Sequence, residues 1–175
     1  MQRELEFINE SISVDSDSSP ETFLILDTET TGLDVHQDKC IEIGVILFHV
    51  NSRSVLAQNS FLLPVENNPA ELINKIPAEI TRLSQPWQEG LRYFNALLQS
   101  ADLVVAHNAE FDKQWFGKSP LPSITTPWIC SMEDISWISK PQLRSRPSVR
   151  DLALAYGVPV WSAHRALSDC IYLAE

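Results

Sequence analysis

The stretch FLILDTETTGL, residues 23–33, decides the fold, because a short apolar run ends abruptly in Asp27 and a second carboxylate, Glu29, follows two positions later. An uninterrupted apolar run of this length is typical of a strand covered on both faces. Side chains two apart on a strand share a face, so Asp27 and Glu29 point into one pocket if the extended backbone continues that far. Two close carboxylates repel, and a divalent cation is the usual compensation. The alternative is a solvated turn, which DTETTG would also suit.

Length and composition indicate one ordinary globular domain of 175 residues with 44% hydrophobic residues. The net charge is −10, and residues 1–22 contribute −5 of it through six acids and one base. If four of the remaining acids bind divalent metals, the body of the chain is nearly neutral. The acidity therefore argues against tight, non-specific duplex binding through a broad basic face, but it does not exclude a phosphate-bearing substrate.

The segment 11–22 is rich in Ser and Asp and has no periodic apolar face. We therefore expect residues 1–21 to be a mobile acidic tail and residues 22–175 to form the domain. No apolar run reaches the length of a membrane span, and no signal peptide is evident, so no membrane partner is expected. Three widely spaced cysteines suggest neither a zinc site nor a disulfide framework, which favours a cytoplasmic location.

The apolar pattern predicts an α/β fold with a mixed central sheet flanked by helices, because three strands in meander are followed by alternating helix and strand. The expected strands are 23–27, 40–50, 54–64, 102–107 and 126–132, and the expected helices are 87–100, 109–116, 148–157 and one from about Arg165, with short helical turns in 69–85. In open sheets of this kind, sites gather at the carboxyl ends of strands, where Asp27 and His107 fall.

Two further clusters carry candidate site residues. HNAEFD, residues 107–112, follows a buried strand, and Asn108 and Asp112 are four apart, as on one helical face. AHRALSD, residues 163–169, separates His164 from Asp169 by five positions, or about 140° of helical rotation. We therefore place Asp169 in a helix and His164 in the loop before it. The structural alternative for HNAEFD is a helix cap followed by a surface acid, and for AHRALSD it is a surface histidine before a helix.

Together, DTETTG, HNAEFD and HRALSD resemble the three motifs of the DEDDh 3′→5′ exonucleases, the family of the proofreading, epsilon-like subunit of bacterial DNA polymerase III. The resemblance runs from about Phe23 to the end of the sequence and implies a ribonuclease H-like fold. It also implies removal of nucleoside 5′-monophosphates from single-stranded DNA or RNA 3′ ends, with DNA favoured. The family's acids match Asp27, Glu29, Asp112 and Asp169, which would hold two Mg²⁺ or Mn²⁺ ions, and its histidine matches His164, the general base.

The same resemblance assigns substrate contacts to Thr30, next to the terminal 3′-OH, and to Leu33, whose side chain would wedge against terminal bases. Gly32 would permit a tight turn near the substrate. Nearby candidates for the sugar or base are Asn108 and Phe111, with core packing or capping as the alternative. The family's His-Gly-Ile element is replaced by INKIPAEI, residues 73–80, where Ile76 is the remaining candidate. The basic strip 140–150 either contacts upstream phosphates or is a solvated loop.

Three other functions stay open at this point. An exoribonuclease resembling RNase T or oligoribonuclease would use the same residues on RNA. A non-catalytic nuclease-fold subunit is disfavoured by the intact set of five catalytic residues. A metal-dependent phosphatase of small nucleotides would cut no polymer. A polymerase or repair partner is compatible with the sequence but is not identified by any segment of it.

Overall fold

The computed structural model describes residues 19–137, 143 and 145–175. Its strands and helices, in chain order, are β1 (Thr22–Thr30), β2 (Cys40–His49), β3 (Ser54–Leu62), α1 (Glu71–Asn74), α2 (Ala78–Thr81), α3 (Trp87–Gln99), β4 (Leu103–Ala106), α4 (Ala109–Lys113), β5 (Trp128–Cys130), α5 (Val149–Ala155) and α6 (Ala166–Ala174). Most of the predicted tail, and Lys140 and Arg144 of the basic strip, lie outside the described residues. Within the described part of the chain, no helix is both long and apolar enough to cross a bilayer.

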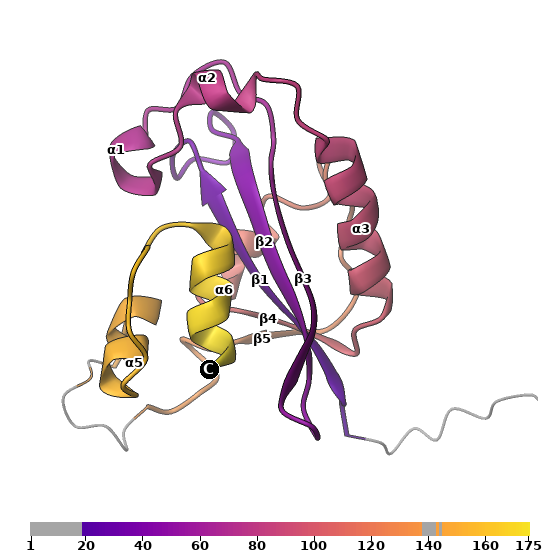
Figure 1. The fold of residues 1–175 in the computed structure, drawn as a ribbon, viewed down its shortest axis with the longest axis vertical. Coiled ribbons are helices and arrows are strands. Elements are labelled where there is room, and N and C mark those ends of the chain that lie inside the picture. The colour runs from indigo at the N-terminus through magenta and orange to yellow at the C-terminus, as the bar shows by residue number, and fades with distance from the viewer. Residues whose placement is uncertain (1–18, 138–142, 144) are drawn as a thin grey trace, which may run out of the picture.

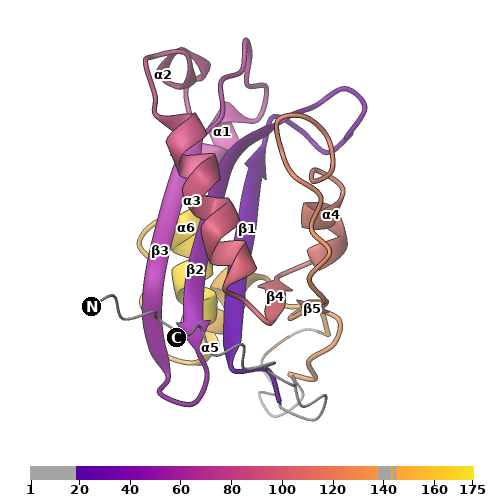
Figure 2. The ribbon, with the colours of Figure 1, turned by 90° about the vertical axis from the view of Figure 1, so that its right-hand side faces the viewer.

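The sheet has the strand order β3-β2-β1-β4-β5. The first three strands form an antiparallel meander, whereas β4 and β5 run parallel to β1. The sheet is therefore mixed, as predicted. Figures 1 and 2 show α3 against one face of the sheet and α6, with α5 beside it, against the other.

Two apolar layers explain why β1 lacks the alternation of a half-exposed strand. Leu24 and Leu26 pack on the α3 side with Phe94, and Ile25 packs on the α6 side with Cys170. All three strand residues are at most 4% exposed. Burial on both faces is what a continuous apolar run predicts for a central strand.

The predicted order of elements is confirmed, and several of their ends differ. β1 runs on to Thr30 because its pairing with β2 continues from Asp27↔Gly44 to Thr30↔Cys40. α4 ends at Lys113, earlier than predicted, and the chain continues in turns. The segment 69–85 forms two single-turn helices, α1 and α2. Gly157 follows α5 with φ of 80°, as its predicted role at the helix end requires.

Candidate active site

Asp27 and Glu29 lie on the face of β1 that α6 covers. The extended backbone continues through both, so they share a face with Ile25, which packs beside Cys170 of α6. Their partners across the sheet are Gly44 and Glu42 of β2. The condition set by the sequence, that the strand must extend past Asp27, is therefore met.

Asp112 joins the first pair from α4. It is 1% exposed, and its Oδ1 atom accepts a 2.7 Å hydrogen bond from Thr28 Oγ1, between the two acids of β1. Its charge contributes to raising the pKa of Asp27, so the two carboxyl groups lie close enough to interact. A short helix directly after β4 thus delivers an acid to the carboxyl end of the neighbouring parallel strand.

His164 and Asp169 come from the loop and first turns of α6, as predicted from their spacing. His164 has φ of 62°, and its backbone N–H donates a 3.2 Å hydrogen bond to Asp169 Oδ2. Ligand atoms of Glu29, His164 and Asp169 all lie within 4.8 Å of one another. The His164 side chain is exposed, so solvent reaches this edge of the cluster.

The acids of this cluster hold their protons far more tightly than isolated carboxyl groups do. Burial, followed by the charges of Asp112, Asp169 and Glu29, raises the pKa of Asp27 well above its usual range. Burial and the Asp169 charge raise the pKa of Glu29 to about 8. Burial raises the pKa of Asp112 to about 7 and that of Asp169 to about 6, against the hydrogen bonds from Thr28 and His164.

This donor set fits a hard divalent cation. Carboxylate oxygens are the preferred ligands of Mg²⁺ and Mn²⁺, and a positive charge placed among these acids would offset the burial that raises their pKa values and the repulsion that further raises those of Asp27 and Glu29. Glu29, His164 and Asp169 can each offer a ligand atom to one ion. The cluster can therefore bind a divalent cation when its acids are ionised.

The segment after β1 forms a tight turn at the rim of the cluster. Thr30 is 7% exposed, and its hydroxyl donates a 2.6 Å hydrogen bond to the carbonyl of Gly32. A Cβ on Gly32 would lie 2.3 Å from an Asp38 carboxylate oxygen, so this position favours glycine. The Leu33 side chain next to it is 81% exposed and free to meet a ligand.

The other candidates for substrate contact are placed less favourably. Asn108 has φ of 66° and makes no side-chain cap, so it shares no regular helical face with Asp112, contrary to the prediction. Phe111 is half-buried and packs edge-to-face on Trp115, with ring centroids 5.8 Å apart. Ile76 is 2% exposed in an apolar cluster beneath α2, so its side chain belongs to the core and not to the exposed rim.

His107, at the predicted strand end, does not join the carboxylates. Its ring nitrogens lie 2.9 Å from Ser131 Oγ and 2.7 Å from the Pro147 carbonyl oxygen. Burial lowers the pKa of its imidazole. His107 therefore holds together the segments after β5 and before α5. Of the basic strip, Arg146 pairs with Glu133 at 3.0 Å.

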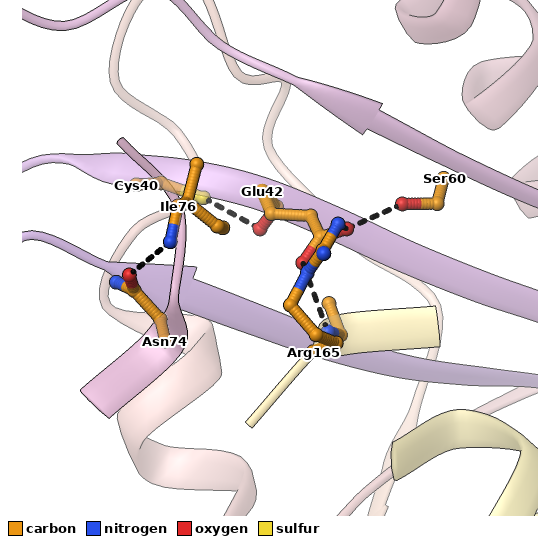
Figure 3. A network of polar contacts seen from close by, with 7 residues as sticks. Cys40, Glu42, Ser60, Asn74, Ile76 and Arg165 are labelled. Carbon is orange, nitrogen blue, oxygen red and sulfur yellow. Dashed lines mark hydrogen bonds and ion pairs between the residues drawn. The ribbon is translucent and has the colours of Figure 1, made fainter. Parts of the chain in front are cut away.

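Two buried polar residues that the sequence analysis missed, Glu42 and Asn74, bond to segments that carry the site residues. Glu42 of β2 is 2% exposed and forms an ion pair with Arg165, which precedes α6 (Figure 3). Asn74 is 1% exposed, and its Nδ2 atom donates a 3.0 Å hydrogen bond to the Thr30 carbonyl. An acid within the apolar run CIEIGVILF is a sequence signal that could have singled out Glu42. Nothing in INKIPAEI distinguishes Asn74 in the same way.

A separate cavity of about 450 Å³ is lined by residues that include Cys40, Leu63, Trp87 and Trp115. None of the five predicted catalytic residues lines it. The cavity is therefore distinct from the carboxylate cluster.

The chain matches one family model and is similar in sequence to several known proteins. The model of the family described as Exonuclease (RNase_T) matches residues 24–175. The chain is 29% identical to the DNA polymerase III subunit epsilon of Treponema pallidum, over 84% of this chain and 70% of the relative. It is 27% identical to the PolC-type DNA polymerase III of Thermotoga petrophila, over 98% of this chain but 13% of that polymerase's length.

Solved structures agree with this assignment of the fold. Exonuclease X in complex with 5′-overhanging duplex DNA superposes with a TM-score of 0.62 and 26% identity, covering 87% of this chain and 86% of that one. Exonuclease I of E. coli in complex with a dT13 oligonucleotide gives a TM-score of 0.68 at 16% identity, covering 88% of this chain and 39% of that one. The mixed sheet with its flanking helices is thus the ribonuclease H-like fold that these exonucleases share.

Proposed function

Because this chain belongs to the Exonuclease family, whose model spans residues 24–175, we propose that it removes nucleotides one at a time from the 3′ end of single-stranded nucleic acid, with DNA as the preferred substrate. The observation that carries this proposal is the convergence of Asp27, Glu29, Asp112 and Asp169 from β1, α4 and α6, with His164 at the exposed edge. Gathering four acids here has no structural benefit, because burial, and at Asp27 and Glu29 also the charges of the other acids, makes their ionised forms costly unless a cation is bound.

The four acids Asp27, Glu29, Asp112 and Asp169 would hold two divalent cations, Mg²⁺ or Mn²⁺. When bound, such cations neutralise the phosphate and make water more acidic. Glu29 and Asp169 already stand within ligand reach of one another. Thr28 orients Asp112 from below, and the His164 backbone N–H orients Asp169.

His164 would accept the proton of the attacking water. The water oxygen forms the new bond to phosphorus, the bond from phosphorus to the 3′ oxygen breaks, and a nucleoside 5′-monophosphate leaves. The 3′ oxygen of the shortened strand takes a proton from solvent and becomes its new 3′-hydroxyl. The imidazole then returns the proton to solvent, which reaches it because the side chain is exposed. An imidazole is suited to this role because its unperturbed pKa lies near neutral pH.

The rim described above would hold the terminal nucleotide. The Thr30–Gly32 turn offers backbone groups beside the cluster, and the exposed Leu33 offers an apolar surface for the last bases.

Support for DNA over RNA comes from relatives only: Exonuclease X and Exonuclease I were solved with DNA, and the epsilon and PolC relatives are named as DNA polymerase III proteins. The same relatives support a replicative polymerase as partner. The matched region is 13% of the PolC length, so the whole protein's substrates and partners belong to this proposal.

A time course on 5′-labelled single strands, one of DNA and one of RNA, tests the proposal. We expect ladders that shrink one nucleotide at a time with Mn²⁺ or Mg²⁺, stop with EDTA and are absent with Asp27→Asn. Faster loss of DNA supports the stated preference, and faster loss of RNA overturns it in favour of an exoribonuclease. Cleavage of neither strand by the wild-type protein would contradict the exonuclease assignment. Nucleotide hydrolysis alone would favour a phosphatase.

A further inference from the structure

The carboxylate of Glu42 is the most heavily bonded buried charge described in the protein. Oε1 accepts hydrogen bonds from Ser60 Oγ at 2.8 Å and from an Arg165 terminal nitrogen at 2.9 Å. Oε2 accepts bonds from Arg165 Nε at 3.0 Å and from the Ala166 backbone N–H at 3.1 Å. The side chain therefore joins β2 to β3 and, across 123 residues of sequence, to the start of α6 (Figure 3).

The bonds from Glu42 take the place of a side-chain N-cap, which α6 lacks. Its N-cap residue, Arg165, makes no side-chain capping bond, and the Ala166 N–H would otherwise be a buried donor without a partner. Glu42 supplies the acceptor from another strand, with the negative charge that a helix N-terminus favours. The helix approaches β2 closely at this point, since a Cβ on Gly44 would lie 2.3 Å from the Leu167 nitrogen.

The residue just before this contact is His164, whose left-handed backbone costs on the order of 1–3 kcal/mol and persists only where the surroundings enforce it. On its upstream side, the Tyr172 hydroxyl accepts hydrogen bonds from the backbone N–H groups of Trp161 at 3.0 Å and Ser162 at 2.9 Å. On its downstream side, Glu42 holds the next two residues, Arg165 and Ala166. The backbone is therefore held by hydrogen bonds on both sides of His164.

We propose that Glu42 and Arg165 are a positioning pair, whose bonds fix the start of α6 and thereby set where His164 stands. Neither is a catalytic residue by this account. A side chain that must reach a proton within hydrogen-bond distance tolerates little displacement, and an error of about 1 Å can cost on the order of 100-fold in rate. The kinetic part of this inference rests on the proposed function, and the structural part does not.

The decisive variant is the double substitution Glu42→Leu with Arg165→Met. Replacing both partners of a buried ion pair by apolar residues of similar size is often neutral for stability, whereas removing one partner strands a buried charge. We expect the double variant to stay folded, with an unfolding midpoint lowered only modestly by the lost acceptor of the Ala166 N–H, and to lose at least tenfold in kcat, with KM changed by less than about threefold. The conservative variant Arg165→Lys, which keeps the charge but not the fork of donors, should fall between it and the wild type. Arg92→Met, which breaks an exposed ion pair with Glu89, is the matched control and should match the wild type.

Amide hydrogen exchange of the metal-free protein supplies a readout that does not need activity. The Ala166 amide should exchange at least tenfold faster in the double variant, because its acceptor is gone, while the amides of β1 keep their protection. A double variant with wild-type kcat and wild-type Ala166 protection would overturn the positioning role. If the wild-type protein cuts no strand, the proposed function fails by itself, and the exchange of Ala166 still decides whether Glu42 holds the start of α6.

Discussion

Thr28 Oγ1 lies 2.7 Å from Asp112 Oδ1 and donates a hydrogen bond to it in the buried floor of the carboxylate cluster. This bond ties β1, which carries Asp27 and Glu29, to the helix that carries Asp112. It also favours the ionised form of Asp112 and so opposes the effect of burial on its pKa. One neutral side chain therefore sets both the position and the protonation of an acid at the candidate metal site.

Thr28→Val should consequently shift the pH dependence of activity. Valine keeps the shape of threonine but donates no hydrogen bond, so the pKa of Asp112 rises above its present value of about 7. Activity needs the ionised acids, so kcat/KM should rise with pH as these acids lose their protons. In Thr28→Val this rise should occur at higher pH, so that kcat/KM falls about tenfold or more at pH 7 and partly recovers at pH 9. Thr81→Val, another buried threonine with a backbone partner away from the cluster, is the control and should leave the profile in place. An unshifted profile in Thr28→Val would show that this bond does not control ionisation.

The metal-free protein should lose stability as pH rises. The pKa of Glu29 is about 8 in the folded chain against 4.5 for a free glutamate, and those of Asp112 and Asp169 are about 7 and 6 against 3.8. Between about pH 4 and pH 8 the folded state thus holds more protons than the unfolded chain, so the free energy of unfolding falls with pH across this window. Urea unfolding in EDTA at a series of pH values measures the slope. Saturating Mn²⁺ should remove most of it, and Asp27→Asn should reduce it because the pKa of Asp27 is itself raised and that group no longer titrates. A free energy of unfolding that does not change with pH in EDTA would mean that folding does not raise the pKa values of these acids.

His164→Ala should reduce kcat by roughly 10²–10⁴-fold if the imidazole is the general base. Because Glu29, Asp27, Asp112 and Asp169 remain, Mn²⁺ binding measured by calorimetry should change little. His49→Ala, at the hairpin end of β2, removes a histidine whose ring hydrogen-bonds with Ser52, and it should leave both quantities unchanged. A parallel collapse of metal affinity and kcat in His164→Ala would reassign the imidazole as a ligand, which its distance from Glu29 and Asp169 allows.

Gly44→Ala should affect the site through the contact between β2 and the start of α6. The new Cβ would lie 2.3 Å from the Leu167 nitrogen and 2.4 Å from the Ala166 carbonyl carbon, and backbone atoms cannot swing aside as a side chain can. The helix must lift from β2, so we expect a loss of about 2 kcal/mol or more in unfolding free energy and a marked fall in kcat. Gly157→Ala is the comparison, since its Cβ meets no atom within 4 Å and only the positive φ opposes it. That variant should lose about 1 kcal/mol and keep its kcat. Equal kcat in both variants would contradict the packing argument.

Much of this molecule could be predicted from local patterns. The apolar run 23–27 indicated a strand buried on both faces, and the helical rotation between His164 and Asp169 correctly placed one in a loop and the other in a helix. These inferences succeeded because each depends on geometry within a few residues. The three exonuclease motifs then indicated the fold and family, which the comparisons confirmed.

The remainder depends on partners far apart in sequence. The left-handed backbone of Asn108 arises at a tight passage from β4 into α4, and it broke the assumption that Asn108 and Asp112 share a helical face. The bonds from Glu42 to the start of α6 and from Asn74 to Thr30 span 124 and 44 residues. No local periodicity carries such information. A buried polar residue is visible in a sequence, but its partner becomes visible only when the chain is folded.

The cluster draws its acids from β1 and α6, the first strand and the last helix among the described residues, with Asp112 between them. During synthesis, β1 leaves the ribosome well over a hundred residues ahead of α6, so the amino-terminal acids wait, without their partners, until the final helix docks on β2. A chain that stops short of Asp169, through early termination or proteolysis, carries two of the three motifs and no complete set of ligands. If these ligands are the catalytic set that we propose, such a fragment would not cut nucleic acid.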